Sequence, residues 1–474
     1  MALPSTDQPI FGACRRVHMV GVGGIGMSSI ADVLLTWGLE VSGSDLTPGP
    51  IGDALRQRGA AIFEGHHPSQ IGEADVVVYT SALDPTTNVE TRAAADQGIP
   101  VINRADMLAA MTRRKFAVGV AGTHGKTTTT TLAGHVARAA DLDPTIIVGG
   151  RVPGFQQKNA VAGQGDTVIM EADEFDRTFL KLTPDIAVIT NIEWEHVDIY
   201  ADLDDTRQAF VDFANKVPFY GTTIACVDDE EVRHILPHID GPTLTYGLHE
   251  GADLRAHALG RQGFETTFEV QRQGQSLGSF QIKAPGDHNI QNALAAIAVG
   301  LQLQVPLPAI RQGLSDYRGV HRRFYHRGQA RGVLVVDDYA HHPTEVEATL
   351  QAARQSFADR RLVVAFQPHL YSRTQKFHRQ FGQALQGCHR LLIADLYPAR
   401  ETPIDGVDAQ LVADAAADQG HPDVTYIPQR KELLDHLIDT CEEGDLLLTM
   451  GAGDITTLGA DLLARLQSSS PSTP

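Results

Sequence analysis

The sequence predicts an α/β protein of three domains, and three observations lead to this prediction. The chain has 474 residues, whereas a single domain usually holds about 100–200. Short β-rich apolar segments alternate with longer amphipathic segments, which is the order of strands and helices in a parallel sheet covered by helices. This alternation starts afresh twice, so we place the domains at residues 1–112, 113–317 and 318–474.

The first domain opens with a glycine-rich turn between a predicted strand and a predicted helix. Gly21, Gly23 and Gly26 give the spacing G-x-G-x-x-G, with Gly24 inside it, and Asp45 ends the next strand. This is the fingerprint of a Rossmann-like domain, in which a diphosphate lies on a helix N-terminus. UDP and NAD both carry a diphosphate, so the turn alone leaves an NAD-dependent dehydrogenase as an alternative.

Strands and helices of the first domain follow from their composition. The expected strands lie in 15–24, 39–45, 74–83 and 99–108, and the amphipathic helices in 25–38 and 84–98.

The second domain is expected to be a parallel sheet with an antiparallel excursion. Its predicted strands lie in 115–121, 166–173, 184–192 and 222–229, and a closing helix lies in 289–303. In segment 252–283, short β-rich runs alternate with glycine-rich turns, and we expect antiparallel strands there.

A phosphate loop follows the first strand of this domain. The sequence GTHGKT at 122–127 is a shortened form of G-x-x-x-x-G-K-[ST]. Gly122 and Gly125 let backbone N–H groups point inward, and the helix that starts in the threonine run favours a phosphate at its N-terminus. Lys126 would reach the β- and γ-phosphates. We predict a P-loop ATPase-type domain; a simple glycine turn is the alternative.

Hard oxygen ligands for Mg²⁺ are expected beside the phosphate loop. Thr127 offers a hydroxyl, and Glu171 ends a strand next to the P-loop strand; Glu174 is the second choice and Asp173 a weaker one. His196 follows another strand and is a candidate to ligate the metal or orient a reacting group, although a lone histidine is often structural. Mn²⁺ is an alternative cation.

The third domain repeats the strand–helix alternation in a Rossmann-like manner. Its predicted strands lie in 332–338, 360–369, 389–398, 424–430 and 444–454. Pro343 with a nearby carboxylate suits a helix start, so the segment 337–345 has a purely structural reading beside a functional one.

Composition narrows the partners and the compartment. The net charge of −19 disfavours a protein that neutralises nucleic acid. Four scattered cysteines without a C-x-x-C pair argue against disulfides or a thiolate zinc site. No run of about 18 apolar residues and no basic-then-apolar leader is present. We therefore expect a cytoplasmic protein that binds neither nucleic acid nor membrane.

Nine motifs in a fixed order give the chain a family resemblance. After the two glycine turns come EADE at 171–174 and TNIEWEHVDIY at 190–200, and the later motifs are GDHNIQNALAA at 286–296, GVHRRF at 319–324, DDYAHHPTE at 337–345, FQPHLYSR at 366–373 and GAGDI at 451–455. In this order they closely resemble the Mur ligases of bacterial peptidoglycan synthesis, over about residues 15 to 460.

The resemblance implies an ATP-dependent carboxylate–amine ligase. The expected reaction joins L-alanine to the lactyl carboxylate of UDP-N-acetylmuramate through an acyl phosphate, with ATP and Mg²⁺. The first domain would hold the UDP-sugar, the second ATP, and the third, a lid, the amino acid. A monomer or a weak homodimer is expected.

The same resemblance assigns residues to each ligand. The UDP-sugar would lie against Gly21, Gly23, Gly24, Gly26, Asp45, His66 and Ser81. ATP would contact Gly122, Thr123, His124, Gly125, Lys126, Thr127, Thr128, His288, Asn289, Asn292, Arg323 and Asp338. The amino acid would contact Tyr339, His341, His342 and Arg373, and the catalytic group would be Lys126, His196, Arg373 and His342. Thr127, Glu171 and His196 would hold the metal.

Two positions call for comment against the family pattern, and two alternative functions stay open. Leu370 stands where some relatives carry arginine, so no amino-acid contact is assigned there. Lys181 is not assigned as a carbamylated metal ligand, because the alanine-adding branch is not expected to use one. A ligase that recycles a whole tripeptide onto the same UDP-sugar is the nearest rival, and the dehydrogenase is the rival from another class.

Overall fold

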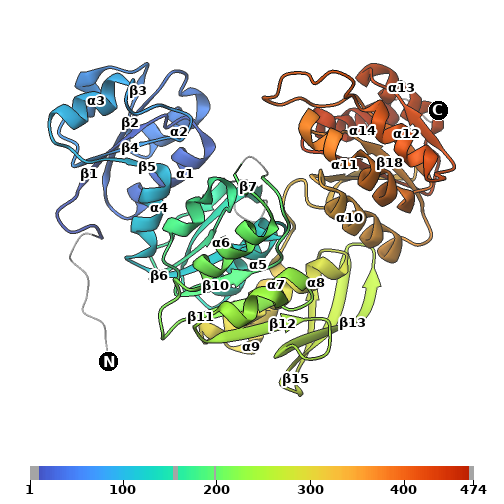
Figure 1. The fold of residues 1–474 in the computed structure, drawn as a ribbon, viewed down its shortest axis with the longest axis horizontal. Coiled ribbons are helices and arrows are strands. Elements are labelled where there is room, and N and C mark those ends of the chain that lie inside the picture. Colours follow the sequence, from blue (N-terminus) through green and yellow to red (C-terminus); the bar gives the residue numbers. More distant parts are fainter. Residues whose placement is uncertain (1–9, 153–157, 197–198, 469–474) are drawn as a thin grey trace, which may run out of the picture. The chain divides into compact units, whose positions relative to one another are not determined.

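The fold is built on three β-sheets that follow one another along the chain. The computed structural model describes residues 10–152, 158–196 and 199–468. Figure 1 colours the strands of the first sheet blue, those of the second cyan to yellow and those of the third orange to red. The chain divides into two compact units: Met1–Ala256, Val270–Gly278 and Gln291–Tyr317 form one, and His257–Glu269, Ser279–Ile290 and Arg318–Pro474 form the other.

The first sheet has five parallel strands in the order β3-β2-β1-β4-β5. Its elements are β1 (Arg16–Val20), α1 (Ile25–Thr36), β2 (Glu40–Asp45), α2 (Gly49–Gln57), β3 (Ala61–Glu64), η1 (Pro68–Ile71), β4 (Val76–Tyr79), α3 (Val89–Asp96), β5 (Val101–Asn103) and α4 (Arg104–Thr112). The chain turns to opposite sides of β1 to reach β2 and β4. The glycine turn after β1 therefore lies where the strand order reverses, which is the usual ligand position in such sheets.

The second sheet has ten strands in the order β15-β14-β13-β12-β11-β10-β6-β9-β7-β8. Its strands are β6 (Phe116–Ala121), β7 (Thr145–Val152), β8 (Lys158–Val161), β9 (Thr167–Glu171), β10 (Ile186–Ile189), β11 (Thr222–Cys226), β12 (Thr243–Gly247), β13 (Leu254–Gln262), β14 (Glu265–Arg272) and β15 (Gln275–Ile282). The P-loop strand β6 pairs in parallel with β9 and β10, so both neighbours end at the edge where the P-loop begins.

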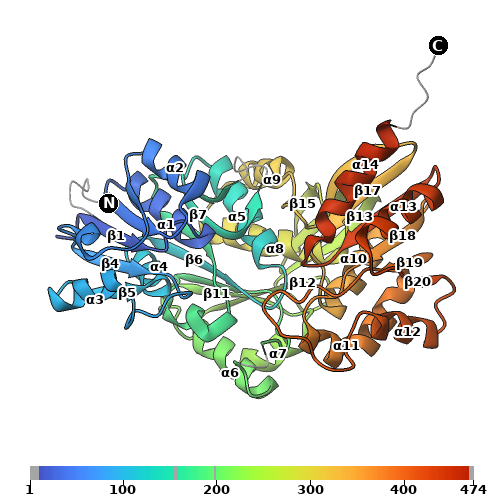
Figure 2. The same cartoon turned by 90° about the horizontal axis from the view of Figure 1, so that it is seen from above.

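Helices cover both faces of the second sheet. They are α5 (Lys126–Ala139), η3 (Phe175–Lys181), α6 (Leu203–Ala214), α7 (Glu230–Ile235), η4 (Leu236–His238), α8 (Asp287–Gln302) and α9 (Leu307–Asp316). Figure 2 shows α6 and α7 on one face and α5 with α9 on the other. The links β13–β14 and β14–β15 are two residues long, which is enough only for antiparallel hairpins, so the predicted antiparallel excursion is confirmed.

The third sheet has six strands in the order β16-β17-β21-β18-β19-β20, parallel except for the β16–β17 hairpin. Its elements are β16 (Tyr325–Ala330), β17 (Val333–Asp338), α10 (Pro343–Ser356), β18 (Arg361–Phe366), α11 (Tyr371–Ala384), η5 (Leu385–Gly387), β19 (Arg390–Ile393), α12 (Gln410–Asp418), β20 (Val424–Tyr426), α13 (Arg430–Thr440), β21 (Asp445–Met450), η6 (Asp454–Thr457) and α14 (Leu458–Ser468). The predicted Rossmann-like alternation is confirmed.

Sequence patterns missed mainly strands at or near sheet edges. Strand β3 carries one buried side chain in four, and β16 has the polar sequence YHRGQA with one buried residue in six. An edge strand lacks the continuous apolar run of a central parallel strand, so its sequence carries little strand signal.

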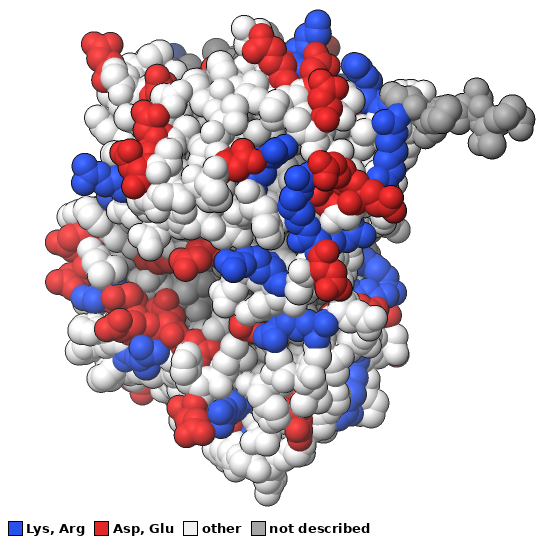
Figure 3. Space-filling model, turned by 90° about the vertical axis from the view of Figure 1, so that its right-hand side faces the viewer, with Lys and Arg blue, Asp and Glu red and all other residues white. Residues whose placement is uncertain are grey.

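The cysteines form no cross-links, since all four are free thiols. On the face drawn in Figure 3, acidic and basic side chains are interspersed. Among the described residues, no helix combines the length and the apolar character that crossing a membrane requires.

An aromatic cluster packs the α6 face of the second sheet. Phe179, Phe210 and Phe213 are fully buried, and the Phe179 ring centroid lies 5.5 Å from that of Phe210 and 5.1 Å from that of Phe213. A Cβ on Gly119 of β6 would lie 3.1 Å from the Phe213 ring, so this ring packs directly on the P-loop strand.

We predict that Phe213→Ala lowers the stability of the first unit by about 3–5 kcal/mol, because it leaves a cavity against β6. Thermal unfolding followed by circular dichroism measures the effect. Phe219→Ala is the matched control, since Phe219 is 89% exposed and should leave the melting temperature unchanged. Equal melting temperatures for the two variants would contradict the assignment of the core.

Candidate active site

The phosphate loop is intact and closely packed. It runs from β6 into α5, and Gly122 and Gly125 have φ angles of +138° and +83°, which favour glycine. A Cβ on Gly122 would lie 1.9 Å from Thr190 Oγ1, and one on Gly125 would lie 2.6 Å from Asn292 Oδ1. Because α5 begins at Lys126, its first amides have no partner within the helix and are available to an anion.

The segment after β10 holds the outer half of this loop. Asn191 accepts hydrogen bonds from the amides of Thr123 (3.1 Å, to its carbonyl oxygen) and His124 (2.8 Å, to Oδ1). The Thr190 hydroxyl donates to the His124 carbonyl at 2.6 Å, and the Glu193 amide donates to Thr123 Oγ1 at 2.8 Å. Motif spacing does not reveal this role of residues 190–193, because a loop that supports another loop has no spacing signature.

Lys126 lies in a buried ion pair with Glu174. Its Nζ is 2.9 and 2.7 Å from the two carboxylate oxygens and donates also to the carbonyls of Gly122 (2.7 Å) and Thr123 (3.2 Å). Burial opposes the charged amine, but Glu174 and then Asp173 outweigh it and raise the pKa of Lys126. The lysine is therefore a fixed cation at the mouth of the loop.

Thr127 and Glu171, the two predicted oxygen ligands of a cation, lie together; their contact with a cation stays a prediction. Burial raises the pKa of Glu171 at the end of β9, whereas the Gly149 amide, at 2.8 Å from Oε1, and the Thr127 hydroxyl lower it. A hydroxyl and a partly dehydrated carboxylate are the donors that Mg²⁺ prefers.

His196 lies beside two acidic side chains, those of Glu174 and Glu195. The ligand atoms of Glu174, Glu195 and His196 all lie within 4.8 Å of one another. His196 Nε2 is 3.9 Å from Glu174 Oε1 and 4.0 Å from Glu195 Oε2. The backbone of His196 has a φ of +53°, which is unusual away from glycine, and its ring meets the Phe175 ring edge-on. These three groups form a second place where a cation could bind.

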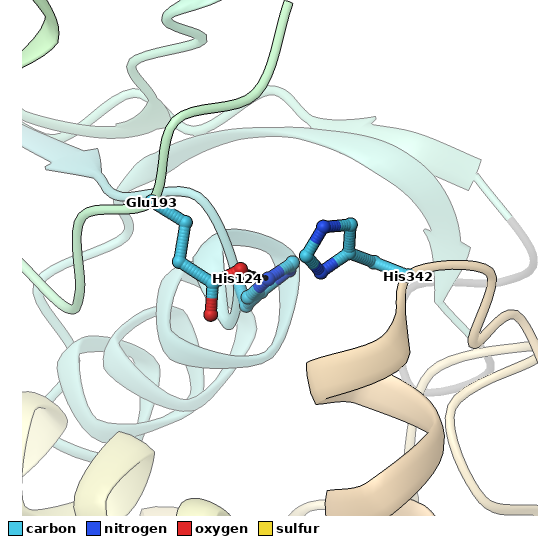
Figure 4. Close-up of side chains that lie close together, drawn as sticks. All are labelled: His124, Glu193 and His342. Atoms are coloured by element: carbon cyan, nitrogen blue, oxygen red, sulfur yellow. Dashed lines mark ion pairs between the residues drawn. The ribbon is translucent and has the colours of Figure 1, made fainter. Parts of the chain in front are cut away.

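The imidazole of His124 faces the carboxylate of Glu193. Its Nε2 lies 3.3 Å from Glu193 Oε2 (Figure 4). The histidine was predicted only as part of the phosphate loop, so Glu193 is a further residue of this site. Figure 4 also draws His342, which belongs to the second unit and is the N-cap residue of α10.

The turn after β1 is closed by Asp45. The Gly23 amide donates to Asp45 Oδ2 at 2.9 Å, and the Thr47 amide donates to Oδ1 at 2.9 Å. Gly21 has a φ of +83°, and a Cβ there would lie 2.5 Å from Thr80 Cγ2. The structure thus gives Asp45 a part in shaping the turn, while its contact with a UDP-sugar stays a prediction.

A cation missed from the sequence lies at the start of α1. A Cβ on Gly26 would lie 2.8 Å from Arg104 Nη1. Arg104 is the first residue of α4, far from the turn in sequence, and Gly24 at the start of α1 provides no side-chain cap. This arrangement places a guanidinium beside the helix N-terminus that is expected to bind the diphosphate.

His66 belongs to a buried polar network, whereas Ser81 is exposed. His66 Nδ1 lies 2.9 Å from Ser44 Oγ and 3.2 Å from Glu90 Oε2. Burial raises the pKa of Glu90, but the nearby imidazole of His18, with Nε2 at 3.7 Å from Oε1, and a hydrogen bond from Ser44 outweigh it and the net pKa is lowered. Glu90 therefore fixes the His66 ring. Ser81 follows β4 in an exposed turn.

The start of α8 carries the residues predicted for the adenine. Asn292 Oδ1 accepts from Thr129 Oγ1 at 3.1 Å, which ties α8 to α5. His288 Nε2 lies 3.0 Å from Asn289 Nδ2, and burial lowers the pKa of His288 to about 4. The ring is neutral at neutral pH and can accept a hydrogen bond.

In the third sheet, the end of β17 holds Asp338 and Tyr339. Asp338 accepts from the amides of Phe324 (2.6 Å) and Ala340 (2.8 Å), and burial raises its pKa to about 6. Tyr339 lies under the guanidinium of Arg323 at 5.3 Å and against the ring of His341 at 4.8 Å. These predicted residues form one cluster within the second unit; their ligand contacts stay predictions.

His369 is a residue of this cluster that the sequence analysis did not select. Its ring stacks on Tyr397 at 5.8 Å and meets His341 edge-on at 5.8 Å. Burial, with the charges of His341 and Arg373, lowers the pKa of His369 to about 4. Leu370 next to it has a φ of +69°, so the chain bends sharply into α11, on whose first turn Arg373 lies.

Lys181 is engaged away from the phosphate loop. Its Nζ lies 2.7 Å from Asp106 Oδ1, and Asp106 forms the capping box of α4. This ion pair ties the Lys181 side chain to the first turn of α4.

Three family descriptions match the chain in order along its length. These are "Mur ligase family, catalytic domain" over residues 16–116, "Mur ligase middle domain" over 120–300 and "Mur ligase, glutamate ligase domain" over 322–453. The chain belongs to the Mur ligase family.

Individual relatives within this family indicate which kind of Mur ligase the chain resembles. The chain is 50% identical over 448 residues to UDP-N-acetylmuramate–L-alanine ligase of Salinibacter ruber, with 94% of each chain covered. The crystal structure of UDP-N-acetylmuramate–alanine ligase from Thermotoga maritima superposes with a TM-score of 0.76 at 29% identity, covering 96% of this chain and 100% of that one. A murein peptide ligase from Psychrobacter arcticus gives a TM-score of 0.63 at 23% identity, covering 97% and 100%, and shares the fold.

We predict that Lys126→Met removes ATP binding and also destabilises the first unit by about 3–5 kcal/mol, because Glu174 is left buried without its partner. The double variant Lys126→Met/Glu174→Gln should regain stability but not ATP binding. Thermal unfolding and equilibrium binding of ATP measure the two effects. Wild-type ATP affinity in the single variant would exclude Lys126 from the phosphate site.

The lowered pKa of His369 predicts a pH dependence. Because the folded-state pKa of about 4 lies below the ordinary value of 6.5, the unfolded chain takes up the proton first. Stability is therefore lost as the pH falls from about 6.5 to 4. In His369→Phe, which keeps a ring against Tyr397, this part of the slope of melting temperature against pH should disappear. An unchanged slope would mean that His369 titrates normally.

Proposed function

We propose that this chain joins L-alanine to the lactyl carboxylate of UDP-N-acetylmuramate with ATP, in the synthesis of peptidoglycan precursors. The observation that carries the proposal is the P-loop with its buried lysine cation in a chain so similar to the Salinibacter ruber ligase. The murein peptide ligase supports the fold only, because its identity to this chain is low.

The first step would transfer the γ-phosphoryl group of ATP to the lactyl carboxylate. An oxygen of that carboxylate attacks the γ-phosphorus, the bond to the bridging oxygen breaks, and ADP leaves with an acyl phosphate formed. Both reactants are anions, so the site must neutralise charge. The Lys126 ammonium and the first amides of α5 supply fixed positive ends there.

Mg²⁺ fits the donors found beside the loop. Thr127 with Glu171 offers hard oxygen ligands, and Glu174, Glu195 and His196 offer a further set. The ion would supply charge neutralisation between the phosphates and the acceptor carboxylate. Thr127, Glu171 and His196 are the residues that we propose to hold it.

The second step would form the amide. The neutral amine of L-alanine attacks the acyl carbon, a tetrahedral intermediate forms, and the C–O bond to phosphate breaks. No protein nucleophile takes part. Arg373, Tyr339, His341 and His342 of the second unit would bind the amino acid, with the Arg373 guanidinium opposite its carboxylate. The acyl phosphate hydrolyses readily, so exclusion of water during this step is essential.

Mass spectrometry after incubation with ATP, Mg²⁺, UDP-N-acetylmuramate and single amino acids tests the proposal. The expected product is the L-alanyl amide, with one phosphate released for each amide. Glycine, L-serine and the tripeptide are the competing acceptors. Product with the tripeptide but not with L-alanine would favour recycling, and no product with any acceptor would overturn the proposal.

We predict that Arg373→Ala raises the KM for L-alanine by about 10–100-fold, because a charge-assisted hydrogen bond to its carboxylate is lost. The dissociation constant of UDP-N-acetylmuramate should stay unchanged. Steady-state kinetics and calorimetry measure the two quantities. A selective loss of UDP-sugar binding would reverse the assignment of ligands to the two units.

A further inference from the structure

Glu345 is a buried carboxylate that contacts two residues expected to serve different ligands. It is the third residue of α10, and its side chain is 8% exposed. Oε1 lies 3.1 Å from Arg323 Nη1, and Oε2 accepts from the His341 amide at 3.0 Å and lies 3.1 Å from His341 Nδ1. Arg323 was predicted for the nucleotide and His341 for the amino acid.

The aromatic ring of Tyr339 closes this arrangement. It lies 4.7 Å from the Arg322 guanidinium and 5.3 Å from that of Arg323, and it meets the His341 ring at 4.8 Å. His341 Nδ1 also lies 2.9 Å from the Tyr339 carbonyl oxygen. Arg323 and His341 contact the Glu345 carboxylate, and the Tyr339 ring packs against both of them. A shift of one of these three side chains therefore changes the packing of the other two.

Glu345 helps to keep the Arg323 guanidinium charged. Burial opposes the charge of this guanidinium, but Glu345, and after it Asp338, outweigh burial and raise the pKa of Arg323. Both oxygens of Asp338 already accept backbone amides. Glu345 is thus the carboxylate in direct contact with the guanidinium, at 3.1 Å.

We propose that Glu345 is a positioning residue that couples the nucleotide and amino-acid subsites of the second unit. A phosphate that draws the Arg323 guanidinium away from Oε1 leaves the charge of Glu345 less compensated. The carboxylate then holds the N–H groups of His341 more firmly, in the orientation that meets the amino acid. Such coupling is reciprocal, so the amino acid also strengthens nucleotide binding. This inference rests on the proposed function.

Glu345→Gln tests the positioning role, because glutamine keeps the volume and one acceptor oxygen but loses the charge. The KM values for L-alanine and ATP should each rise about tenfold, as expected for loss of a charge-assisted contact. The UDP-N-acetylmuramate dissociation constant should stay at the wild-type value. The fall in melting temperature should be small, because the Arg323 side chain is 33% exposed and Asp338 still offsets its charge. Glu347→Gln, an exposed carboxylate on the same helix, is the matched control and should match the wild type throughout.

A double-mutant cycle with Arg323→Gln tests the coupling itself. Arg323→Gln removes the cation that the nucleotide would draw away, so it should abolish the effect of the ATP concentration on the KM for L-alanine in the wild-type background but change little in Glu345→Gln. Glu345→Asp keeps the charge and should restore part of the loss. If Glu345→Gln does not fold, Glu345→Asp takes its place in the double-mutant cycle.

Three results would overturn the coupling. They are multiplicative effects in the cycle, a Glu345→Gln variant equal to the Glu347→Gln control, and parallel losses of stability and UDP-sugar binding. Absence of amide formation by the wild-type protein would instead contradict the proposed function, so the two failures are distinguishable.

Discussion

The buried ion pair between Lys126 and Glu174 is the interaction on which the site depends. A lysine in the interior stays charged only if an anion lies beside it, and here a carboxylate supplies that anion at 2.7 Å. The ligand atoms of Glu174, Glu195 and His196 also lie within 4.8 Å of one another. In the proposed function, the phosphates of the nucleotide take the place of the Glu174 carboxylate beside Lys126, and Glu174 then faces the cation.

Carboxylates at the end of a strand or in the first turn of a helix organise other loops in the same way. Asp45 accepts amides of the glycine turn, Asp338 accepts amides on both sides of β17, and Glu345 joins Arg323 to His341. Each of these side chains shapes a loop at an edge where ligands bind in α/β sheets. Part of the negative charge of the chain is thus used inside the protein, to fix backbone amides and cations.

Motif spacing predicted the residues whose roles are local. The P-loop residues 122–127 act through one strand, one turn and one helix, which are contiguous in sequence, and the structure has this strand–turn–helix arrangement. The position of Glu171 beside the loop could be predicted because parallel strands that flank the P-loop strand end at the same edge. Residues such as Asn191, Arg104 and His369 were missed, because each acts on a segment far away in the chain and no periodicity marks such a contact.

The class of fold, the three sheets and the phosphate loop follow from local features of the sequence, because strand composition, helical periodicity and glycine positions are properties of short stretches of the chain. The sequence also carried the ordered motifs that the family matches confirm. The three-dimensional packing of the chain selects the carboxylate that pairs with Lys126 and the residues that support the loop. It also brings Glu345 between Arg323 and His341. Those choices depend on which strand ends become neighbours and on how far each side chain is removed from water, and neither is written in the local sequence.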